Sequence, residues 1–160
     1  MIDLLETFVQ ICREQFQFLV DEFGCHVAVS HDKSIWYEAS VIFQNTTTAV
    51  MTQCDLRDDI VNTVLMQLMD GRLPAYADST HTQGLWTVLR IRGGPKFPHG
   101  NVRTAEAIER VLVQEAVALR TYARDILEGD FSIFPELKRI KLAVYGPHPA
   151  SGEGSGEGVS

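Results

Sequence analysis

The sequence predicts an α+β domain, in which an antiparallel meander of about four strands is covered by an N-terminal helix and a long C-terminal helix. Helical periodicity at both ends of the chain predicts the two helices, over residues 2–22 and 102–128. Between them, apolar residues alternate with polar ones, and the turns between these runs are too short for crossover connections. The length of 160 residues is that of one domain, which we expect over residues 1–145, followed by a disordered Gly/Ser/Glu tail at 146–160.

Both ends of the N-terminal helix carry recognisable signals. Apolar residues recur at steps of three and four through residues 2–22 and form one broad face. Asp3 is a plausible N-cap, and Glu6 stands three residues later, at the second position of a capping box. Gly24 is suited to end the helix because glycine takes a positive φ without a Cβ clash.

The middle of the chain predicts the meander. Residues 25–30, 35–44 and 47–54 are β-rich runs separated by the turns HDKS and Asn45-Thr46. The run at 60–69 fits either a helix or a strand, and we interpret it as a fourth strand because its β-branched residues directly follow the charged turn DLRDD.

Residues 70–84 predict a surface loop, because they are rich in turn formers. Residues 85–92 form either a short helix or an edge segment, and 93–101 a second loop with two prolines and three glycines.

The helix at 102–128 has an apolar stripe interrupted only by Glu115. It ends at a hinge on Gly129-Asp130. We expect Phe131 and Phe134 to anchor this turn in the core, and Pro135 to start a further helix.

Composition indicates a globular protein of the cytosol. Hydrophobic residues make up 45% and charged residues 22%, no apolar run approaches a membrane span, and the N-terminus lacks a secretory signal. The three cysteines form no CxxC pair, and we expect Cys12, Cys25 and Cys54 to be reduced core thiols. The net charge of −7 argues against nucleic acid and favours another protein, of basic character, as partner; we expect no membrane contact.

An acidic turn is the first candidate site. Asp55, Asp58 and Asp59 supply carboxylates of the kind that bind Mg²⁺ or share protons, and Asp70 is a candidate neighbour across the sheet. DLRDD lacks the spacing of a calcium loop, however, and Arg57 within it is a ready counter-ion. We therefore interpret it as a solvated turn available for binding, and expect neither a metal nor a cofactor.

Catalytic patterns are sparse. The five histidines show no HxH or HExxH spacing, and there is no GxSxG. A Cys–His nucleophile requires the fold to bring His26 or His31 close to Cys54. RIRGGPK, with Arg90, Arg92 and Lys96, superficially resembles an anion-binding loop but lacks P-loop spacing, so we interpret it as a basic loop. Recognition of a carboxylate or an acidic partner is its main alternative.

Three aromatic residues complete the candidate binding set. Trp36, Tyr76 and Trp86 fall near predicted edges or loops, and tryptophan and tyrosine are enriched in binding hot spots, although such residues are also ordinary cover for a small sheet. With the acidic turn they give the predicted binding residues Trp36, Asp55, Asp58, Asp59, Tyr76 and Trp86.

The segment from Asp125 to Leu137, with the pattern ILxGDFSxFPEL, resembles a group of small uncharacterised bacterial proteins of the immunity-protein-like type. The resemblance extends to the helix end at Phe23-Gly24 and to DLRDDIV at residues 55–61. Its motifs are structural and carry over no site residues. It implies a small acidic partner of a bacterial toxin.

We therefore expect a non-enzymatic acidic protein-interaction module, with an immunity-type inhibitor as one form of it. A metal-dependent or Cys–His enzyme with its site at the sheet edge is one alternative. The other is a structural homodimer paired through an exposed strand edge.

Overall fold

The computed structural model describes residues 3–32 and 34–146 and confirms the α+β class. One antiparallel sheet has its strands in chain order: β1 (His26–Ser30), β2 (Glu38–Gln44), β3 (Thr48–Asp55), β4 (Ile60–Gln67) and β5 (Thr82–Gly84). The run at 60–69 is thus a strand, as predicted. The fifth strand was missed and lay inside the predicted loop 70–84, because three residues are too few to show a period of two.

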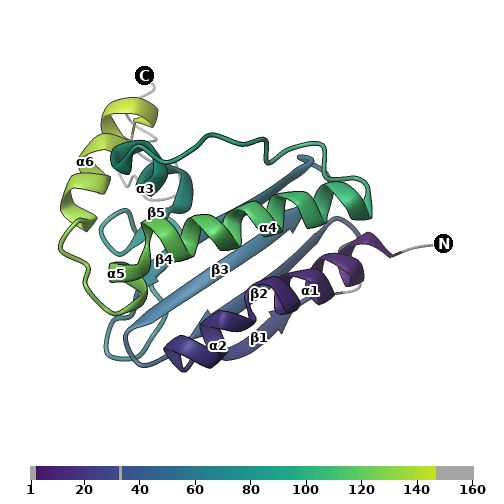
Figure 1. Cartoon of the computed structure of the whole chain (residues 1–160), viewed down its shortest axis with the longest axis horizontal. Helices are drawn as coiled ribbons and strands as arrows, with labels where there is room; N and C mark the ends of the chain where they lie inside the picture. The colour runs from purple at the N-terminus through teal and green to yellow at the C-terminus, as the bar shows by residue number, and fades with distance from the viewer. Residues whose placement is uncertain (1–2, 33, 147–160) are drawn as a thin grey trace, which may run out of the picture.

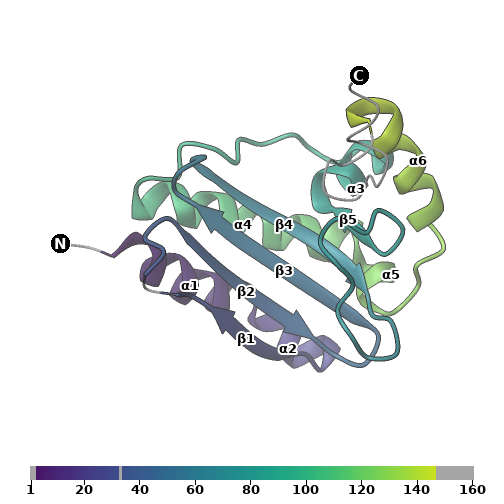
Figure 2. The same ribbon diagram turned by 180° about the vertical axis from the view of Figure 1, so that it is seen from behind.

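The helices α1 (Leu4–Gln15), α2 (Gln17–Phe23) and α4 (Ala105–Tyr122) lie on one face of the sheet (Figure 1). This confirms the predicted helical cover. Figure 2 shows the opposite face, on which no helix of the described residues lies over β1, β2 or β3. The three remaining helices gather at the end near β5: α3 (Leu85–Arg92), α5 (Arg124–Leu127) and α6 (Phe134–Tyr145).

The N-terminal helix begins and ends as predicted but is divided. Asp3 Oδ1 accepts hydrogen bonds from the backbone N–H of Leu5 at 3.0 Å and of Glu6 at 3.1 Å. Gly24 takes a left-handed φ of 69°. The division between α1 and α2 falls at Phe16, whose fully buried ring lies 5.7 Å from that of Phe43. Packing of this ring onto the sheet, which local sequence does not reveal, accompanies the break.

The predicted long helix is also divided, at Ala123 between α4 and α5. Arg92 at the end of α3 reaches this break: its guanidinium donates to Tyr122 O and makes two hydrogen bonds of 2.7 Å to the Asp125 carboxylate. The segment at 85–92 is therefore a helix whose last residue ties α3 to the junction of α4 and α5.

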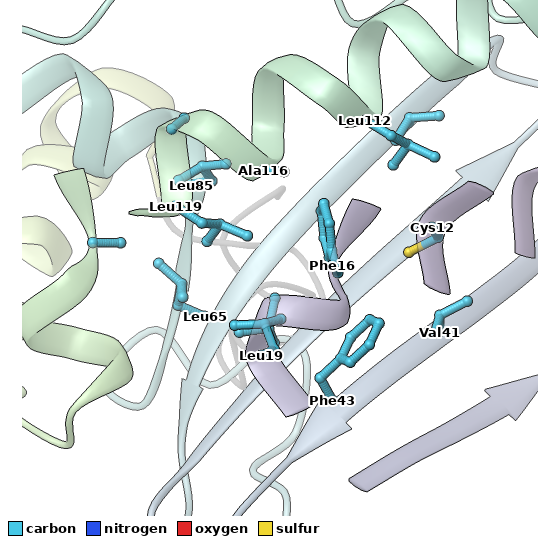
Figure 3. Packing of buried hydrophobic residues seen from close by; sticks show 14 of the residues in the cluster. Cys12, Phe16, Leu19, Val41, Phe43, Leu65, Leu85, Leu112, Ala116 and Leu119 are labelled. Carbon is cyan, nitrogen blue, oxygen red and sulfur yellow. The ribbon is translucent and has the colours of Figure 1, made fainter. Parts of the chain in front are cut away.

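The core lies between the helices and the sheet (Figure 3). Its centre is formed by large apolar side chains from both layers, including Leu19, Leu112 and Leu119 from the helices and Phe43 and Leu65 from the sheet. A smaller cluster on the opposite face of the sheet consists of Ala49, Val64, Met66 and Leu68. There the loop between β4 and β5 contacts the sheet.

The hinge at Gly129 is confirmed. Gly129 has a φ of 96°, Phe134 is only 2% exposed, and Pro135 lies in the first turn of α6. The rings of Phe131 and Phe134 meet edge to face at 5.1 Å. The predicted tail, apart from Gly146, lies outside the described residues. Within residues 3–32 and 34–146, no helix has the length and apolarity needed to cross a membrane.

Candidate functional site

One edge of the sheet is open. β1 is the first strand in the sheet order and, in the part of the chain that the structure describes, pairs only with β2. β5 at the other edge has three residues and packs against α3 and α6. β1 has the sequence HVAVS, without the lysine, proline or bulge that commonly protect an exposed edge. Among residues 3–32 and 34–146, Figure 2 shows no element beside its outer side.

The hydrogen-bond pattern of the sheet reveals which groups of β2 point to β1. Asn45 N–H donates to Thr48 O at 3.0 Å, and Leu56 N–H donates to Tyr37 O at 2.7 Å. The two bonds flank the β2–β3 pair at its two ends. The residues on the β2 side are Asn45 and Tyr37, and both have odd numbers. Because bonded pairs alternate in an antiparallel ladder, the odd-numbered residues of β2 bond to β3 and the even-numbered ones to β1.

Applied to β1, the same alternation identifies its free backbone groups. Ala28 pairs with Ile42, an even-numbered residue of β2, so Ala28 bonds inward. The neighbours Val27 and Val29 must then direct their N–H and C=O groups to the open edge. These are the groups that an added strand would bond.

An apolar groove lies beside this edge on the helical face. Val9 of α1 and Val29 of β1 are among the residues that line it, and its volume is about 430 Å³. Val29 is 41% exposed although its side chain faces the helical layer. Polar residues of α1 and of the loop after β1 complete the lining: Glu6, Gln10, Arg13, Glu14 and His31.

The acidic turn proves to be mainly a backbone support. Asp55 Oδ1 accepts from Arg57 N–H at 2.8 Å and from Asp58 N–H at 3.0 Å. Asp59 takes a positive φ of 60°, and its carboxylate accepts from Val102 N–H at 2.8 Å. Only Asp58 has a mainly exposed side chain, at 68%. Asp70 follows the far end of β4, so its expected proximity to the turn is wrong.

Trp36 lies at the same end of the molecule as this turn. Its ring is 66% exposed and meets Tyr37 edge to face at 5.5 Å, and the Arg57 guanidinium stands 4.4 Å from the centre of the Tyr37 ring. The predicted second strand began at residue 35, but β2 begins at Glu38 and leaves Trp36 in the preceding turn. The structure therefore places Trp36 at the same end of the sheet as Asp55, Asp58 and Asp59.

Tyr76 and Trp86 form a separate group. Both line a hollow of about 170 Å³, which also includes Asn62 and Lys141. Asn62 Nδ2 donates to the Tyr76 hydroxyl at 3.0 Å. Trp86 also lines a second, larger hollow.

The cysteines have the properties of buried thiols, as predicted. All three are free and buried. Burial raises the pKa of Cys25 to about 11 and of Cys54 to about 12, and it raises the pKa of Cys12 further. At neutral pH these groups are protonated and poor nucleophiles. Among the described residues, no three His, Cys, Asp or Glu side chains lie close enough together to hold a metal ion.

A buried polar cluster in the core was not predicted. Thr63 on β4 donates to Glu115 Oε1 at 2.6 Å, and its hydroxyl lies 2.8 Å from that of Thr52 on β3. Glu115 is fully buried, and burial raises its pKa to about 8, against the opposing effect of the Thr63 hydrogen bond. The carboxyl is therefore mainly uncharged at neutral pH. The only signal in the sequence was that Glu115 interrupted an apolar stripe.

Comparison of the chain with protein-family models, with curated proteins and with solved structures finds no match.

Proposed function

We propose that the protein is a non-enzymatic protein-binding module that takes up an extended segment of a partner protein as a sixth strand beside β1. The observation that carries this proposal is the combination of outward backbone groups at Val27 and Val29 with the apolar groove beside them. Backbone hydrogen bonds supply affinity in strand addition, and pockets for alternate side chains supply specificity.

The groove defines the side chains that the partner needs. Successive residues of a strand point to opposite faces, so every second residue of an added strand is directed toward the helical face, where Val9 and Val29 offer apolar contact. The net charge of −7, and a groove lining with two glutamates against one arginine, favour lysine or arginine at the remaining positions.

A second copy of this chain carries the same −7 charge, which opposes pairing of two copies. We therefore assign the edge to a different, basic protein. The proposal includes a cytosolic location and no nucleic-acid or membrane partner. An immunity-type inhibitor is one form of this function, and its support is the sequence resemblance alone.

Short peptides test the proposal directly. The probes are fluorescent seven-residue peptides that alternate valine with lysine, the same design with glutamate, and the lysine peptide with its valines grouped at one end. We expect the alternating basic peptide to bind at least about tenfold more tightly than both others, because it alone matches the groove and the charge. Fluorescence polarisation at moderate salt measures the three affinities.

A proline variant tests the location. Val29→Pro removes one outward N–H but leaves the inward bonds of β1 intact, and proline is tolerated at an edge strand. We expect Val29→Pro to weaken binding of the basic peptide at least about tenfold. The matched control Val29→Thr, which keeps the N–H, should change the affinity by less than about threefold. Thermal melting verifies that both variants fold.

Two results contradict the proposal. Equal binding of the basic peptide to folded Val29→Pro and to Val29→Thr places the interaction elsewhere. Sedimentation of the wild type as a dimer that Val29→Pro dissociates assigns the edge to a second copy.

A further inference from the structure

The larger hollow beside Trp86 lies near the opposite edge of the sheet from β1. We call it the Trp86 pocket; it has a volume of about 480 Å³, within the range of small-molecule sites. Helix α3 contributes Trp86, Leu89 and Arg90, and the loop after it contributes Lys96, Phe97 and His99. It is thus built from one helix and the chain that folds back over it.

Aromatic rings form one wall. The Trp86 ring centre lies 4.5 Å from that of Phe97 and 4.4 Å from that of His99, the latter at an interplanar angle of 36°. Trp86 is half-buried, while Phe97 is 9% exposed and anchors the loop. An aromatic wall of this kind favours a planar ligand, since ring stacking adds to the burial of apolar area.

Two exposed cations stand at this wall. Arg90 follows Trp86 by four residues on α3, which places both side chains on the same face of the helix. Arg90 and Lys96 have no ion-pair partner within residues 3–32 and 34–146, whereas Arg92 is occupied by Asp125. The pocket therefore has a charge opposite to the net charge of the chain.

The loop that carries Lys96, Phe97 and His99 is fixed at both ends. At its start, Gly93 has a φ of 69° and Gly94 N–H donates to Leu89 O at 2.8 Å. A Cβ at Gly94 would approach Leu89 Cδ2 to 2.6 Å, so any other residue here would force the buried Leu89 side chain to shift. At its end, His99 O accepts from Val61 N–H of β4 at 3.0 Å. The walls are pre-formed, which lowers the entropic cost of binding.

We propose that the Trp86 pocket binds a small planar anion, namely an aromatic ring that carries a phosphate or a carboxylate. The ring stacks on the wall formed by Trp86 and His99. The negative group pairs with Arg90 and Lys96, which can contact phosphate or carboxylate oxygens. This site is independent of strand addition at β1.

Intrinsic tryptophan fluorescence can report ligand binding in this pocket selectively. The chain has two tryptophans, so a Trp36→Phe background leaves Trp86 as the only indole. The probes are AMP, naphthalene-2-carboxylate, adenosine and inorganic phosphate. We expect AMP, the naphthoate or both to change Trp86 fluorescence with half-saturation below about 1 mM, and adenosine and phosphate to bind at least about tenfold more weakly. The two anions distinguish a phosphate ligand from a carboxylate one.

Charge-matched variants test the role of the cations. In the same background, Arg90→Gln/Lys96→Gln is compared with Arg72→Gln/Arg110→Gln, which removes two exposed positive charges elsewhere. The pocket variant should lower the affinity for the anion at least about tenfold more than the control does. The proposal is overturned if neither anion gives a saturable change, if adenosine binds as tightly as AMP, or if the two double variants bind the anion equally.

Discussion

Replacement of Glu115 by glutamine tests the physical account of the core. Glu115 is fully buried between α4 and the sheet, with one oxygen bonded to Thr63 and the other without a partner among the described side chains. Burial raises its pKa from 4.5 to about 8. The folded protein therefore holds a proton that the unfolded chain releases.

The sign and size of the effect follow from this difference. Stabilisation by the bound proton is complete below pH 4.5 and is lost as the pH rises toward 8. One pKa unit corresponds to about 1.4 kcal/mol, so the unfolding free energy of the wild type should fall by about 4 kcal/mol between pH 5 and pH 8 through this group. Glutamine is neutral at every pH and lacks this dependence, although its unpaired amide adds a roughly constant cost of about 1–3 kcal/mol.

Urea unfolding of both proteins at pH 5, 6, 7 and 8 measures the effect. We expect the unfolding free energy of Glu115→Gln, relative to wild type, to rise with pH by about 4 kcal/mol across this range. Groups that titrate in both proteins cancel in the comparison. Glu109→Gln is the matched control, since Glu109 is exposed on the same helix. A difference that stays constant with pH within about 0.5 kcal/mol would refute an uncharged Glu115.

Three further predictions concern the hinge, the α3 junction and the thiols. Gly129→Val should lower the unfolding free energy by about 1 kcal/mol or more, because of the φ of 96° and a Cβ position 3.2 Å from Thr47 Oγ1; an unchanged melting temperature contradicts this. Asp125→Asn should lower it by roughly 1–2 kcal/mol at pH 7. Because Arg92 lowers the pKa of Asp125, this loss should shrink as the pH falls below about 4, and urea unfolding that shows the same loss at pH 3 contradicts the ion pair. The three cysteines should react with a disulfide reagent only as fast as the protein unfolds, and rapid labelling of any one in folded protein contradicts its burial.

The features that sequence predicted correctly have local causes. Asp3, Gly24 and Gly129 act on the backbone within a few residues of themselves, so the type of residue is sufficient to place a helix end. The antiparallel meander likewise follows from alternation and short turns. The run at 60–69 was identified as a strand because of its entry from a turn, although its periodicity was ambiguous.

The errors have non-local causes. β5 exists because residues 82–84 pair with β4, and the division of the first helix falls where Phe16 packs against Phe43. The second division falls at Ala123, beside the contact of Arg92 with Asp125. The secondary-structure propensity of one segment does not depend on such contacts and therefore cannot predict them.

The candidate sites divide in the same way. Residue types indicated the aromatic and acidic candidates, but only the tertiary structure showed that Asp55 and Asp59 support the backbone while Tyr76 and Trp86 line one hollow. The same holds for the three cations of RIRGGPK. Only the tertiary structure showed that Arg92 is occupied by its ion pair with Asp125, whereas Arg90 and Lys96 line the Trp86 pocket.

By itself, the sequence determined the class of the fold, several ends of its helices and strands, and its acidic charge, because these depend on local periodicity, on caps and on composition. The tertiary structure decided which strand edge is open, which cations lack partners and which carboxyl is buried. Each of these depends on which distant segments meet, and burial and pairing are properties of that assembly rather than of any one residue.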